Sequence, residues 1–558
     1  MSLARVAACW IVGQLIVLAS SGSAPEVPRF GIFEVGFEAQ AHYANPYRDV
    51  EAEAELMPPS GPVRRIPLFW DGGATFRLRF SPDEIGIWKY TVFSSDRGLN
   101  GRSGIFRCVP SDRRGSLQLM RAYPRHLQYQ NGEPCWFMGD TAWALFCDLP
   151  EERHHRESAF HYLRTRASQG FNVVHSMLLS ESGHGNSGGP PFHDIATERL
   201  NPAYWQEVDT RLRYANQLGL VVGLALAWGD KGRKEPWAWS RFPDTEATRR
   251  YTRYVAGRYG AFDIYFIVAG EWHAEARTRK GAAESEIFRK FVQIGSVLQQ
   301  ADPHRRLIAI HPMSYHGSVR EFASAPWMSF GDYQQNYAHL HERALLSVGL
   351  TRPVVNSEYG YFLRDADGDG IPDKDNSLSV EDMRHASWDI AMGGAYLVTG
   401  FGTTYFGGYR DPGPFDVDTP RNDPWEEQIQ YLKSFFTPLE WWKLIPSDHI
   451  LRSAAPRSSD RRLESRQASR VFRLLRPPET VYWGMQVPGE VYVVYYRGLD
   501  QPLEIELHSR PGIFSVEVYD PRTGRTQALG NIDIERLYQH APRNREDWVL
   551  LLRRLPTP

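Results

Sequence analysis

Residues 264–271 read IYFIVAGE, a short apolar run that ends in a carboxylate. The run is rich in β-branched and aromatic residues and is short for a helix, so it favours a strand. A strand that is apolar on both faces is typical of a parallel sheet covered on both sides. The sequence therefore predicts a buried parallel strand with Glu271 at its carboxyl end.

Seven further runs of the same kind occur along the chain, and helix-like segments such as PAYWQEVDTRLRYANQLG (202–219) lie between most of them. They are CWFMGD (135–140), FNVVHSMLL (171–179), LVVGLALAW (220–228), RLIAIHP (306–312), WMSFGDY (327–333), PVVNSEY (353–359) and GAYLVTG (394–400). Eight strands alternating with helices predict an α/β fold of the (β/α)₈ TIM barrel type over residues 125–445. A doubly wound sheet is the alternative, but the dinucleotide turn G-x-G-x-x-G does not follow an early strand.

Both flanks of the barrel have the pattern of β-domains. Short runs such as FRLRFSP (76–82) and GIWKYTVFSS (86–95) precede it, and VYVVYYRG (491–498) and DWVLLLRR (547–554) follow it. Turn residues separate these runs, as in small sandwiches. We therefore expect an N-terminal β-sandwich over 28–120 and a C-terminal β-sandwich over 446–558.

The first residues, 1–24, have the pattern of a secretory signal peptide. One arginine precedes an apolar stretch from Val6 to Ala19, and small residues follow near the expected cleavage point at 21–24. A membrane anchor is the alternative, but the apolar stretch is short for a span. We expect a secreted or periplasmic protein without membrane attachment after cleavage.

Composition narrows the range of ligands. The formal net charge is −2, so the chain lacks the excess of basic residues that would indicate binding to nucleic acid. Aromatic residues make up 13% of the chain, an excess that suits both large cores and a cleft in which flat rings pack on sugar faces.

Two of the predicted strands, the fourth and the seventh, end in glutamate. The carboxyl ends of barrel strands surround one mouth, so Glu271 and Glu358 can be aimed at the same bond. Glycoside cleavage needs such a pair of carboxyl groups. The alternative is that both are ordinary acids at the edges of loops.

Other strand ends supply residue types suited to binding a sugar. Aromatic rings would pack on it, polar groups would bond its hydroxyls, and Tyr333 would hold the nucleophile by a hydrogen bond. Each could instead be a structural residue, and the histidines and acids could hold a metal, although no H-E-x-x-H spacing supports this. The expected substrate-binding residues are Asp140, Trp143, His175, Trp228, Trp272, His311, Asp332 and Tyr333.

The segment DADGDGIPDKDN (365–376) follows Glu358 closely and has the spacing of a calcium loop. Packed aspartates repel one another unless a cation compensates them. Position 12 is Asn376 rather than the glutamate of an EF-hand, so the match covers the first part of the loop only. We expect a structural Ca²⁺ held by Asp365, Asp367, Asp369, the Ile371 carbonyl and Asp373.

Several motifs together resemble a known family. FMGDTAW (137–143), NPAYWQEVD (201–209), FGDYQ (330–334), VVNSEYGY (354–361) and GFGTTYFGG (400–408) look like those of the apiosidase-like glycoside hydrolase barrels. The N-terminal part resembles the small DUF5060-type β-domain, and VYDPRTG (518–524) resembles a C-terminal domain type labelled collagen-binding.

The resemblance implies a retaining glycosidase with its acid/base after strand four and its nucleophile after strand seven, which are Glu271 and Glu358 here. It implies an oligosaccharide or polysaccharide substrate, with a pectic side chain as one candidate. Two alternatives stay open: an endo-acting glycanase, and a non-catalytic carbohydrate-binding protein on a barrel scaffold.

Overall fold

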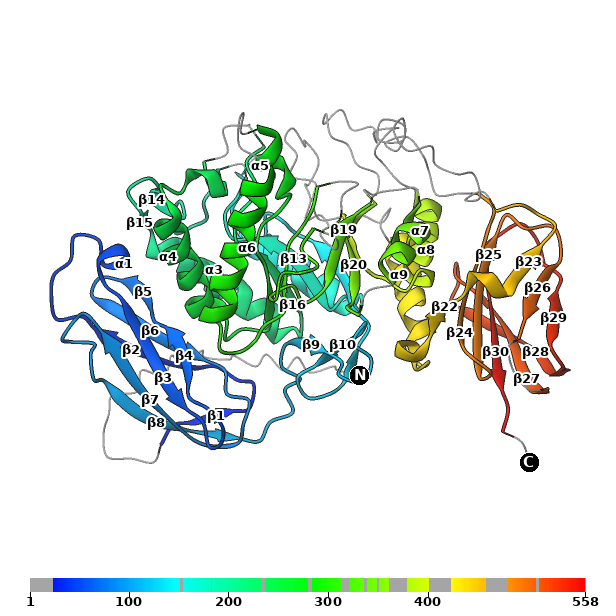
Figure 1. Cartoon of the computed structure of the whole chain (residues 1–558), viewed down its shortest axis with the longest axis horizontal. Coiled ribbons are helices and arrows are strands. Elements are labelled where there is room, and N and C mark those ends of the chain that lie inside the picture. Colours follow the sequence, from blue (N-terminus) through cyan, green and yellow to red (C-terminus); the bar gives the residue numbers. More distant parts are fainter. Residues whose placement is uncertain are drawn as a thin grey trace, which may run out of the picture. The chain divides into compact units, whose positions relative to one another are not determined.

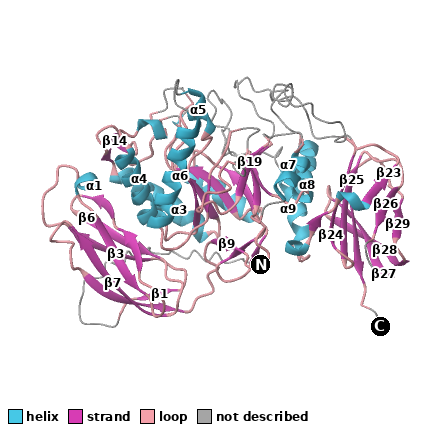
Figure 2. Ribbon diagram, viewed as in Figure 1, coloured by secondary structure: helices cyan, strands magenta, loops and turns pink. Residues whose placement is uncertain are grey.

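The computed structural model describes residues 24–150, 154–181, 183–231, 236–278, 284–313, 317, 321–335, 339–348, 351–360, 379–400, 423–457, 479–507 and 511–556. The chain divides into two compact units, Met1–Asp112 and Arg113–Pro558, which are described in turn. Helices gather around the barrel strands of the second unit, whereas the first and last domains are almost entirely strand (Figures 1 and 2).

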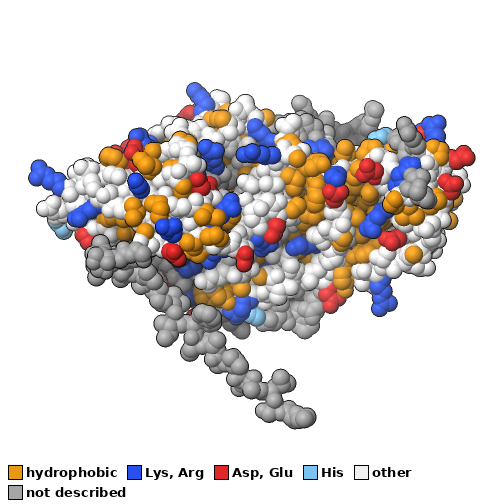
Figure 3. Space-filling view, turned by 90° about the horizontal axis from the view of Figure 1, so that it is seen from below, with side chains coloured by type: hydrophobic (Ala, Val, Ile, Leu, Met, Phe, Trp, Pro, Cys, Tyr) orange, Lys and Arg blue, Asp and Glu red, His pale blue; other side chains and the backbone are white. Residues whose placement is uncertain are grey.

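The surface mixes charges of both signs. On the face shown in Figure 3, lysine and arginine side chains are interspersed with aspartate and glutamate. Among the described helices, none has the length and apolar character needed to cross a membrane.

From residue 24 on, the first unit is a β-sandwich of two sheets and one short helix, α1 (Pro46–Asp49). The larger sheet has the order β1-β8-β7-β3-β4, and the smaller β2-β6-β5. Their bounds are β1 Glu26–Pro28, β2 Phe33–Glu38, β3 Ala52–Met57, β4 Arg64–Pro67, β5 Phe69–Gly72, β6 Thr75–Phe80, β7 Gly86–Ser94 and β8 Ser103–Val109.

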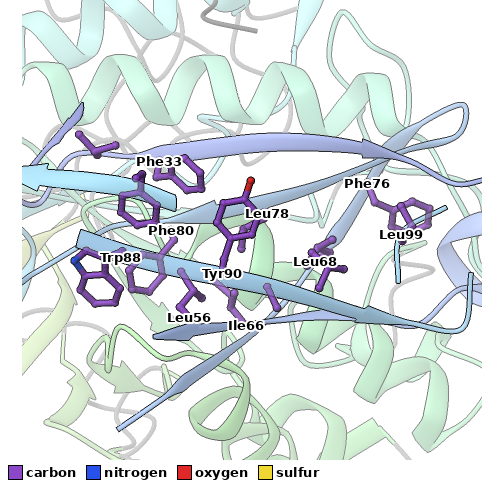
Figure 4. Close-up of a cluster of buried hydrophobic side chains, with 14 of the residues drawn as sticks. Phe33, Leu56, Ile66, Leu68, Phe76, Leu78, Phe80, Trp88, Tyr90 and Leu99 are labelled. Atoms are coloured by element: carbon purple, nitrogen blue, oxygen red, sulfur yellow. The ribbon is translucent and has the colours of Figure 1, made fainter. Parts of the chain in front are cut away.

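Alternation along the strands builds the core of this sandwich. Phe76, Leu78 and Phe80 follow one another at every second position of β6 and are all buried. Trp88 and Tyr90 do the same on β7 of the other sheet. Figure 4 shows these side chains directed into the space between the two sheets. A period of two places one face of each strand in the core, which confirms the predicted N-terminal sandwich.

The second unit contains the predicted barrel. Eight parallel strands follow the order β18-β17-β16-β13-β12-β21-β20-β19. The gap between the end strands is bridged where the Ser329 amide donates to the Ile308 carbonyl at 2.8 Å, so the sheet is nearly closed. The strands are β12 Met138–Thr141, β13 Val173–Met177, β16 Val221–Ala225, β17 Ile264–Ile267, β18 Ile308–Ala309, β19 Gly331–Gln334, β20 Val354–Tyr359 and β21 Tyr396–Thr399. Six of them lie inside one of the apolar runs, and β12 and β19 each extend one residue beyond theirs, so the sequence prediction of a TIM barrel is confirmed.

Helices surround these strands. Figure 1 shows α3, α4 and α6 on one side of the sheet and α7, α8 and α9 on the other. They are α2 Arg156–Ser168, α3 Pro202–Gln217, α4 Thr245–Tyr259, α5 His273–Thr278, α6 Glu284–Ala301, α7 Leu340–Val348, α8 Val380–Met392 and α9 Asp423–Phe436, with the 3₁₀ turns η2 Trp239–Arg241 and η4 Trp441–Lys443. A small hairpin, β14 Phe192–Asp194 with β15 Arg199–Leu200, lies between β13 and α3.

A three-stranded sheet of β9 (Leu117–Leu119), β10 (Leu127–Tyr129) and β11 (Pro134–Cys135) precedes the barrel. Ser116 Oγ donates to the carbonyl of Ile264, the first residue of β17, at 2.7 Å. His126 Nδ1 lies 2.8 Å from the hydroxyl of Tyr396, the first residue of β21. Both contacts are at amino ends of strands, so this sheet covers the end of the barrel opposite to the mouth.

The C-terminal domain is a second sandwich, as predicted. Its six-stranded sheet has the order β22-β24-β25-β30-β27-β28 and its three-stranded sheet β23-β26-β29. The bounds are β22 Ile445–Pro446, β23 Leu451–Ser453, β24 Val481–Val487, β25 Val491–Arg497, β26 Leu503–Glu506, β27 Gly512–Asp520, β28 Arg525–Ile534, β29 Leu537–His540 and β30 Trp548–Arg554, with η5 Asp448–Ile450.

Helix α8 joins this domain to the barrel. Asp389 on α8 pairs with Arg497 on β25 at 2.7 Å, and both side chains are buried. The Trp388 ring stacks on Tyr495 with centroids 5.3 Å apart. A buried ion pair and a stacked aromatic pair make this a packed interface within the unit.

Candidate active site

Three rings meet at the carboxyl end of the barrel and are called the ring cluster below: Trp143, Trp228 and His311. The Trp143 and Trp228 centroids are 4.8 Å apart at 79°, and His311 lies 5.3 Å from Trp143 and 5.7 Å from Trp228. They come from the ends of three different strands, which only barrel closure brings together. The sequence prediction that these residues share the mouth agrees with their positions.

Glu271 follows β17 in an unusual conformation. Its φ of 41° lies in the left-handed region, which non-glycine residues seldom adopt. The preceding Gly270 pairs with Trp228, and a Cβ added there would come within 2.1 Å of the Trp228 ring. The close approach of ring and backbone therefore requires glycine. Backbone strain of this kind clusters at functional sites.

The carboxylate of Glu271 is held on two sides. Trp228 Nε1 donates to Glu271 Oε2 at 3.3 Å, and Lys231 Nζ lies 2.5 Å from the same oxygen. Lys231 also lies 2.7 Å from Oε1 of Glu181. Burial alone would raise the pKa of the Glu271 carboxyl, but the Lys231 ammonium outweighs it and lowers that pKa. Lys231 in turn is held as a cation, because Glu271 and Glu181 overcome the effect of burial and raise its pKa.

Glu358 lies on β20, at an irregularity in the strand. Opposite β19, Tyr333 pairs with Asn356 and the next residue, Gln334, pairs with Glu358, so Ser357 is an extra residue. Such a β-bulge re-aims the side chains on the bulged strand. Here both Ser357 and Glu358 reach the same histidine, which a regular strand would prevent because neighbouring side chains alternate between its faces.

That histidine is His311, which is fully buried. Its Nδ1 lies 2.8 Å from Ser357 Oγ and 3.8 Å from Asp332 Oδ2, and its Nε2 lies 3.4 Å from Glu358 Oε2. Burial disfavours the charged imidazole, but the nearby carboxylates of Asp332 and Glu358 outweigh it and raise the pKa of His311 to about 9. Burial raises the pKa of Asp332, although the neighbouring His311 acts to lower it. Asp332 thus acts on Glu358 through the histidine.

The two glutamates are linked through the ring cluster. Trp228 bonds Glu271 and packs near His311, and His311 faces Glu358. An ammonium stands beside one carboxylate and a chargeable imidazole beside the other. Two carboxyl groups in different electrostatic settings can divide the roles of proton donor and nucleophile between them. Within the described ranges no group of three or more histidine, cysteine or acidic side chains could hold a metal.

His175 lies deeper than the mouth. It is on β13 with no exposed surface, and its Nε2 contacts the Tyr265 hydroxyl of β17. Burial, together with the charge of His311, lowers the pKa of His175 well below its usual value. A Cβ on Gly223 would clash with the rings of His175 and Tyr265, so a glycine at this position leaves room for their contact. His175 therefore supports the Trp143 ring, 5.8 Å away, from beneath rather than reaching a ligand.

Asp140 is a correction to the sequence prediction. It receives hydrogen bonds from the Thr141 amide (3.0 Å), Tyr162 Oη (2.8 Å), Arg166 Nε (2.7 Å) and Thr399 Oγ1 (2.5 Å). Arg166 and Asp140 both have no exposed side-chain surface. These donors occupy both carboxylate oxygens, so Asp140 braces β12, β21 and α2 instead of binding a sugar hydroxyl.

Trp272 and Tyr333 are corrections as well. The Trp272 ring packs on Phe322 (5.0 Å) and on Phe291 of α6, because the turn at Glu271 directs the next side chain into the helix layer. The Tyr333 hydroxyl has no hydrogen-bond partner among the described residues. Asp332 faces His311 in the barrel interior, so its neighbour on the strand faces the other way. Tyr333 therefore does not hold Glu358.

Sequence reasoning missed four residues of this site: Glu181, Lys231, Tyr265 and Ser357. Two of them had a readable signal, because Lys231 follows the third strand run by three residues and Glu181 follows the second by two. Tyr265 and Ser357 stand inside their runs, where no local pattern marks them. The predicted calcium ligands at 365–373 lie outside the described residues.

Comparison with known proteins agrees with this fold. A candidate glycoside hydrolase from Bacteroides vulgatus ATCC 8482 covers 95% of this chain and 100% of its own, with a TM-score of 0.70 and 18% identity. A structure described as a glycoside hydrolase covers 79% of this chain and 97% of its own, with a TM-score of 0.60 and 18% identity. A glycoside hydrolase family 5 protein from Bacteroides vulgatus ATCC 8482 covers 79% of this chain and 94% of its own, with a TM-score of 0.60 and 17% identity. A comparison with curated proteins gives no significant match.

Residues 122–443 match the family described as apiosidase-like, catalytic domain, and residues 26–95 match a domain of unknown function, DUF5060. Together with the eight-stranded barrel, the first match defines the protein as an enzyme of the glycoside hydrolase class. The chain belongs to the apiosidase-like family, which confirms the resemblance of its motifs. The likeness of the C-terminal domain to a collagen-binding type stays a prediction.

Proposed function

We propose that the protein is a secreted, retaining glycoside hydrolase in which Glu271 is the acid/base and Glu358 the nucleophile. The observation that carries the proposal is the unequal setting of the two carboxylates around the ring cluster. Glu358 is fixed by a strand bulge against His311, whereas Glu271 stands at a strained turn beside the Lys231 ammonium and is the more exposed of the two, 14% against 5%. A nucleophile needs a fixed carboxylate, and an acid/base needs exchange of a proton with substrate and water.

The reaction then has two steps. Glu358 attacks the anomeric carbon while Glu271 donates its proton to the departing oxygen, so the glycosidic bond breaks and a glycosyl ester forms on Glu358. Glu271, now a carboxylate, takes a proton from water. The resulting oxygen attacks the anomeric carbon and releases Glu358. The imidazole of His311, whose pKa is raised, faces Glu358 and fixes its carboxylate for the attack.

The substrate that we propose is the glycosidic bond of an apiose-type side chain in a plant pectic polysaccharide. Support comes from the description of the family, apiosidase-like, together with the Trp143 and Trp228 rings at the mouth. Export through the signal peptide at 1–24 would bring the enzyme to an extracellular or periplasmic polymer. Sequencing the amino end of the mature protein tests the export step.

The central experiment follows the anomeric configuration of the first product by proton NMR. The full chain is screened on 4-nitrophenyl glycosides of pentoses and hexoses and on pectic polysaccharides, and the substrate hydrolysed fastest is used. Retention of configuration is expected. Inversion would overturn the double-displacement mechanism. Hydrolysis that is equally fast in Glu358→Gln would show that another group performs the chemistry.

Release of internal fragments in place of single sugars would favour the endo-acting alternative over a side-chain glycosidase. Binding of pectic polymers without turnover would favour the non-catalytic alternative. The matched control is Asp140→Asn. It changes a carboxylate at the end of another barrel strand, and the oxygens of this carboxylate already accept hydrogen bonds from four donors of the protein.

A further inference from the structure

Lys231 and Glu181 form an arrangement that the two-step reaction does not by itself require. The ammonium lies 2.5 Å from one oxygen of Glu271 and 2.7 Å from one oxygen of Glu181. The side chains of Glu181, Lys231 and Glu271 are 11%, 16% and 14% exposed, so all three are largely withdrawn from water. One cation is therefore shared by two carboxylates at the mouth of the barrel.

The three residues come from separate loops. Glu181 follows β13, Lys231 follows β16 and Glu271 follows β17, so neighbouring strands deliver them to one place. Lys231 Nζ also lies 5.3 Å from the centroid of the Trp228 ring, whose indole nitrogen donates to Glu271. With two carboxylates around one ammonium, the group has a formal charge of −1, which does not suit the capture of an anionic ligand.

This sharing matters for a general acid. A carboxyl that must give a proton to the leaving oxygen has to hold that proton first. An ammonium that belonged to Glu271 alone would stabilise its ionised form strongly, because opposite charges in a withdrawn site interact more than in water. Glu181 draws part of that interaction away. The charged groups that face Glu271 in the described chain are Lys231 directly, His311 across the ring cluster, and Glu181 behind Lys231.

We infer that Glu181 and Lys231 are positioning residues that set the proton affinity of Glu271: Lys231 stabilises the carboxylate needed as a base, and Glu181 moderates Lys231 so that the acid form is also reached. The inference rests on the proposed function, in which Glu271 is the acid/base. It requires that changes at the two positions act in opposite directions. If the two residues only braced the loops, substitutions at both positions would shift the proton affinity of Glu271 in the same direction, or would change only the stability of the protein.

The test is the pH dependence of kcat/KM on a 4-nitrophenyl glycoside, whose alkaline limb reports loss of the proton from the acid in the free enzyme. Lys231→Met is expected to move this limb to higher pH by roughly 1 to 3 units, the usual influence of a close opposite charge. Glu181→Gln is expected to move it to lower pH, since Lys231 then interacts with Glu271 alone. Lys231→Arg keeps the charge and is expected to restore most of the wild-type profile.

Lys290→Met is the matched control. It removes another partly buried lysine, which pairs with Glu275 at 2.8 Å on the helix side of the barrel, so the limb is expected to stay in place. Should Lys231→Met not fold, as a thermal melt would show, Glu181→Gln and Lys231→Arg still carry the test. A titration of Glu271 by carbon NMR in ¹³C-glutamate-labelled protein, with its signal assigned by Glu271→Gln, gives the same directions without substrate.

The outcomes separate the inference from the proposed function. An alkaline limb that stays in place in Lys231→Met and Glu181→Gln, while Glu271→Gln still slows hydrolysis of poor leaving groups, overturns the inference and leaves the function standing. Shifts in the same direction in both variants overturn it too. Full activity of Glu271→Gln removes the proposed function, and the NMR titration then decides the inference alone.

Discussion

Asp140 and Glu358 are both carboxylates at the carboxyl ends of barrel strands, and both are buried, yet their surroundings differ in kind. The partners of Asp140 are a guanidinium, a phenol, a hydroxyl and an amide, none of which changes charge near neutral pH. Glu358 instead faces His311, an imidazole whose pKa of about 9 lets its charge change within a few pH units of neutrality. Burial alone therefore does not separate a structural carboxylate from the proposed nucleophile, whereas the chemistry of the neighbouring groups does.

The most severe test of this contrast is Glu358→Gln. The amide cannot attack the anomeric carbon, so kcat is expected to fall on the order of 10⁴-fold or more, as when other covalent nucleophiles are removed. The side chain keeps its shape, so the variant should fold, but loss of the charge that faces the buried His311 should lower the melting temperature. Steady-state kinetics with differential scanning fluorimetry measures both. A stable variant with undiminished turnover would place Glu358 among the structural carboxylates.

Glu271→Gln sharpens the same contrast on the other side of the ring cluster. Loss of a general acid is expected to cost about 10²- to 10⁴-fold on a 4-nitrophenyl glycoside. The cost should be smaller on a 2,4-dinitrophenyl glycoside, whose leaving group departs without a proton. The ratio of the two rates is the measurement. An equal loss on both substrates would contradict a role as proton donor.

Asp140→Ala probes the structural member of the pair. Arg166 would be left in the barrel as an unpaired buried charge, and breaking such a pair costs about 3–5 kcal/mol of unfolding free energy. The barrel should melt at a clearly lower temperature, while the folded fraction keeps its kcat. Thermal unfolding and kinetics below the transition test this. A stable variant that is impaired only in KM would restore Asp140 as a sugar ligand.

His311 predicts a dependence of stability on pH. Its folded pKa of about 9 exceeds the unfolded value near 6.5, so its contribution is fully present below about pH 6.5 and is lost as the pH rises through 9. The shift corresponds to about 3 kcal/mol at most. The stability difference between wild type and His311→Gln should therefore shrink from pH 6 to pH 10. A difference that is constant over this range would mean that His311 has the same pKa in the folded and the unfolded protein.

The smallest effect is expected from calcium. If the 365–376 loop binds the ion next to strand seven, chelation should lower the melting temperature by a few degrees, about the size of a 1 kcal/mol change. Added Ca²⁺ should reverse the effect, and Asp367→Asn should reduce it. No response of the melting temperature to chelator would count against the site.

Particular residues show how much of the fold and of the candidate site could be predicted from the sequence. The eight apolar runs, the flanking sandwiches and the positions of Glu271 and Glu358 at strand ends were all predictable, because strand periodicity and strand ends are local properties of the chain. Trp143, Trp228 and His311 followed from the same rule, since the carboxyl ends of barrel strands meet at one mouth.

What only the tertiary structure decided is which side chains meet. Trp272 turned into the helix layer because Glu271 has a positive φ, and Tyr333 faced away because Asp332 faces inward. The bulge at Ser357, the four donors around Asp140 and the contact of Lys231 with Glu181 depend on register and on approach between segments far apart in the chain. No local period encodes such contacts, because they form only when the barrel closes and brings its strand ends together.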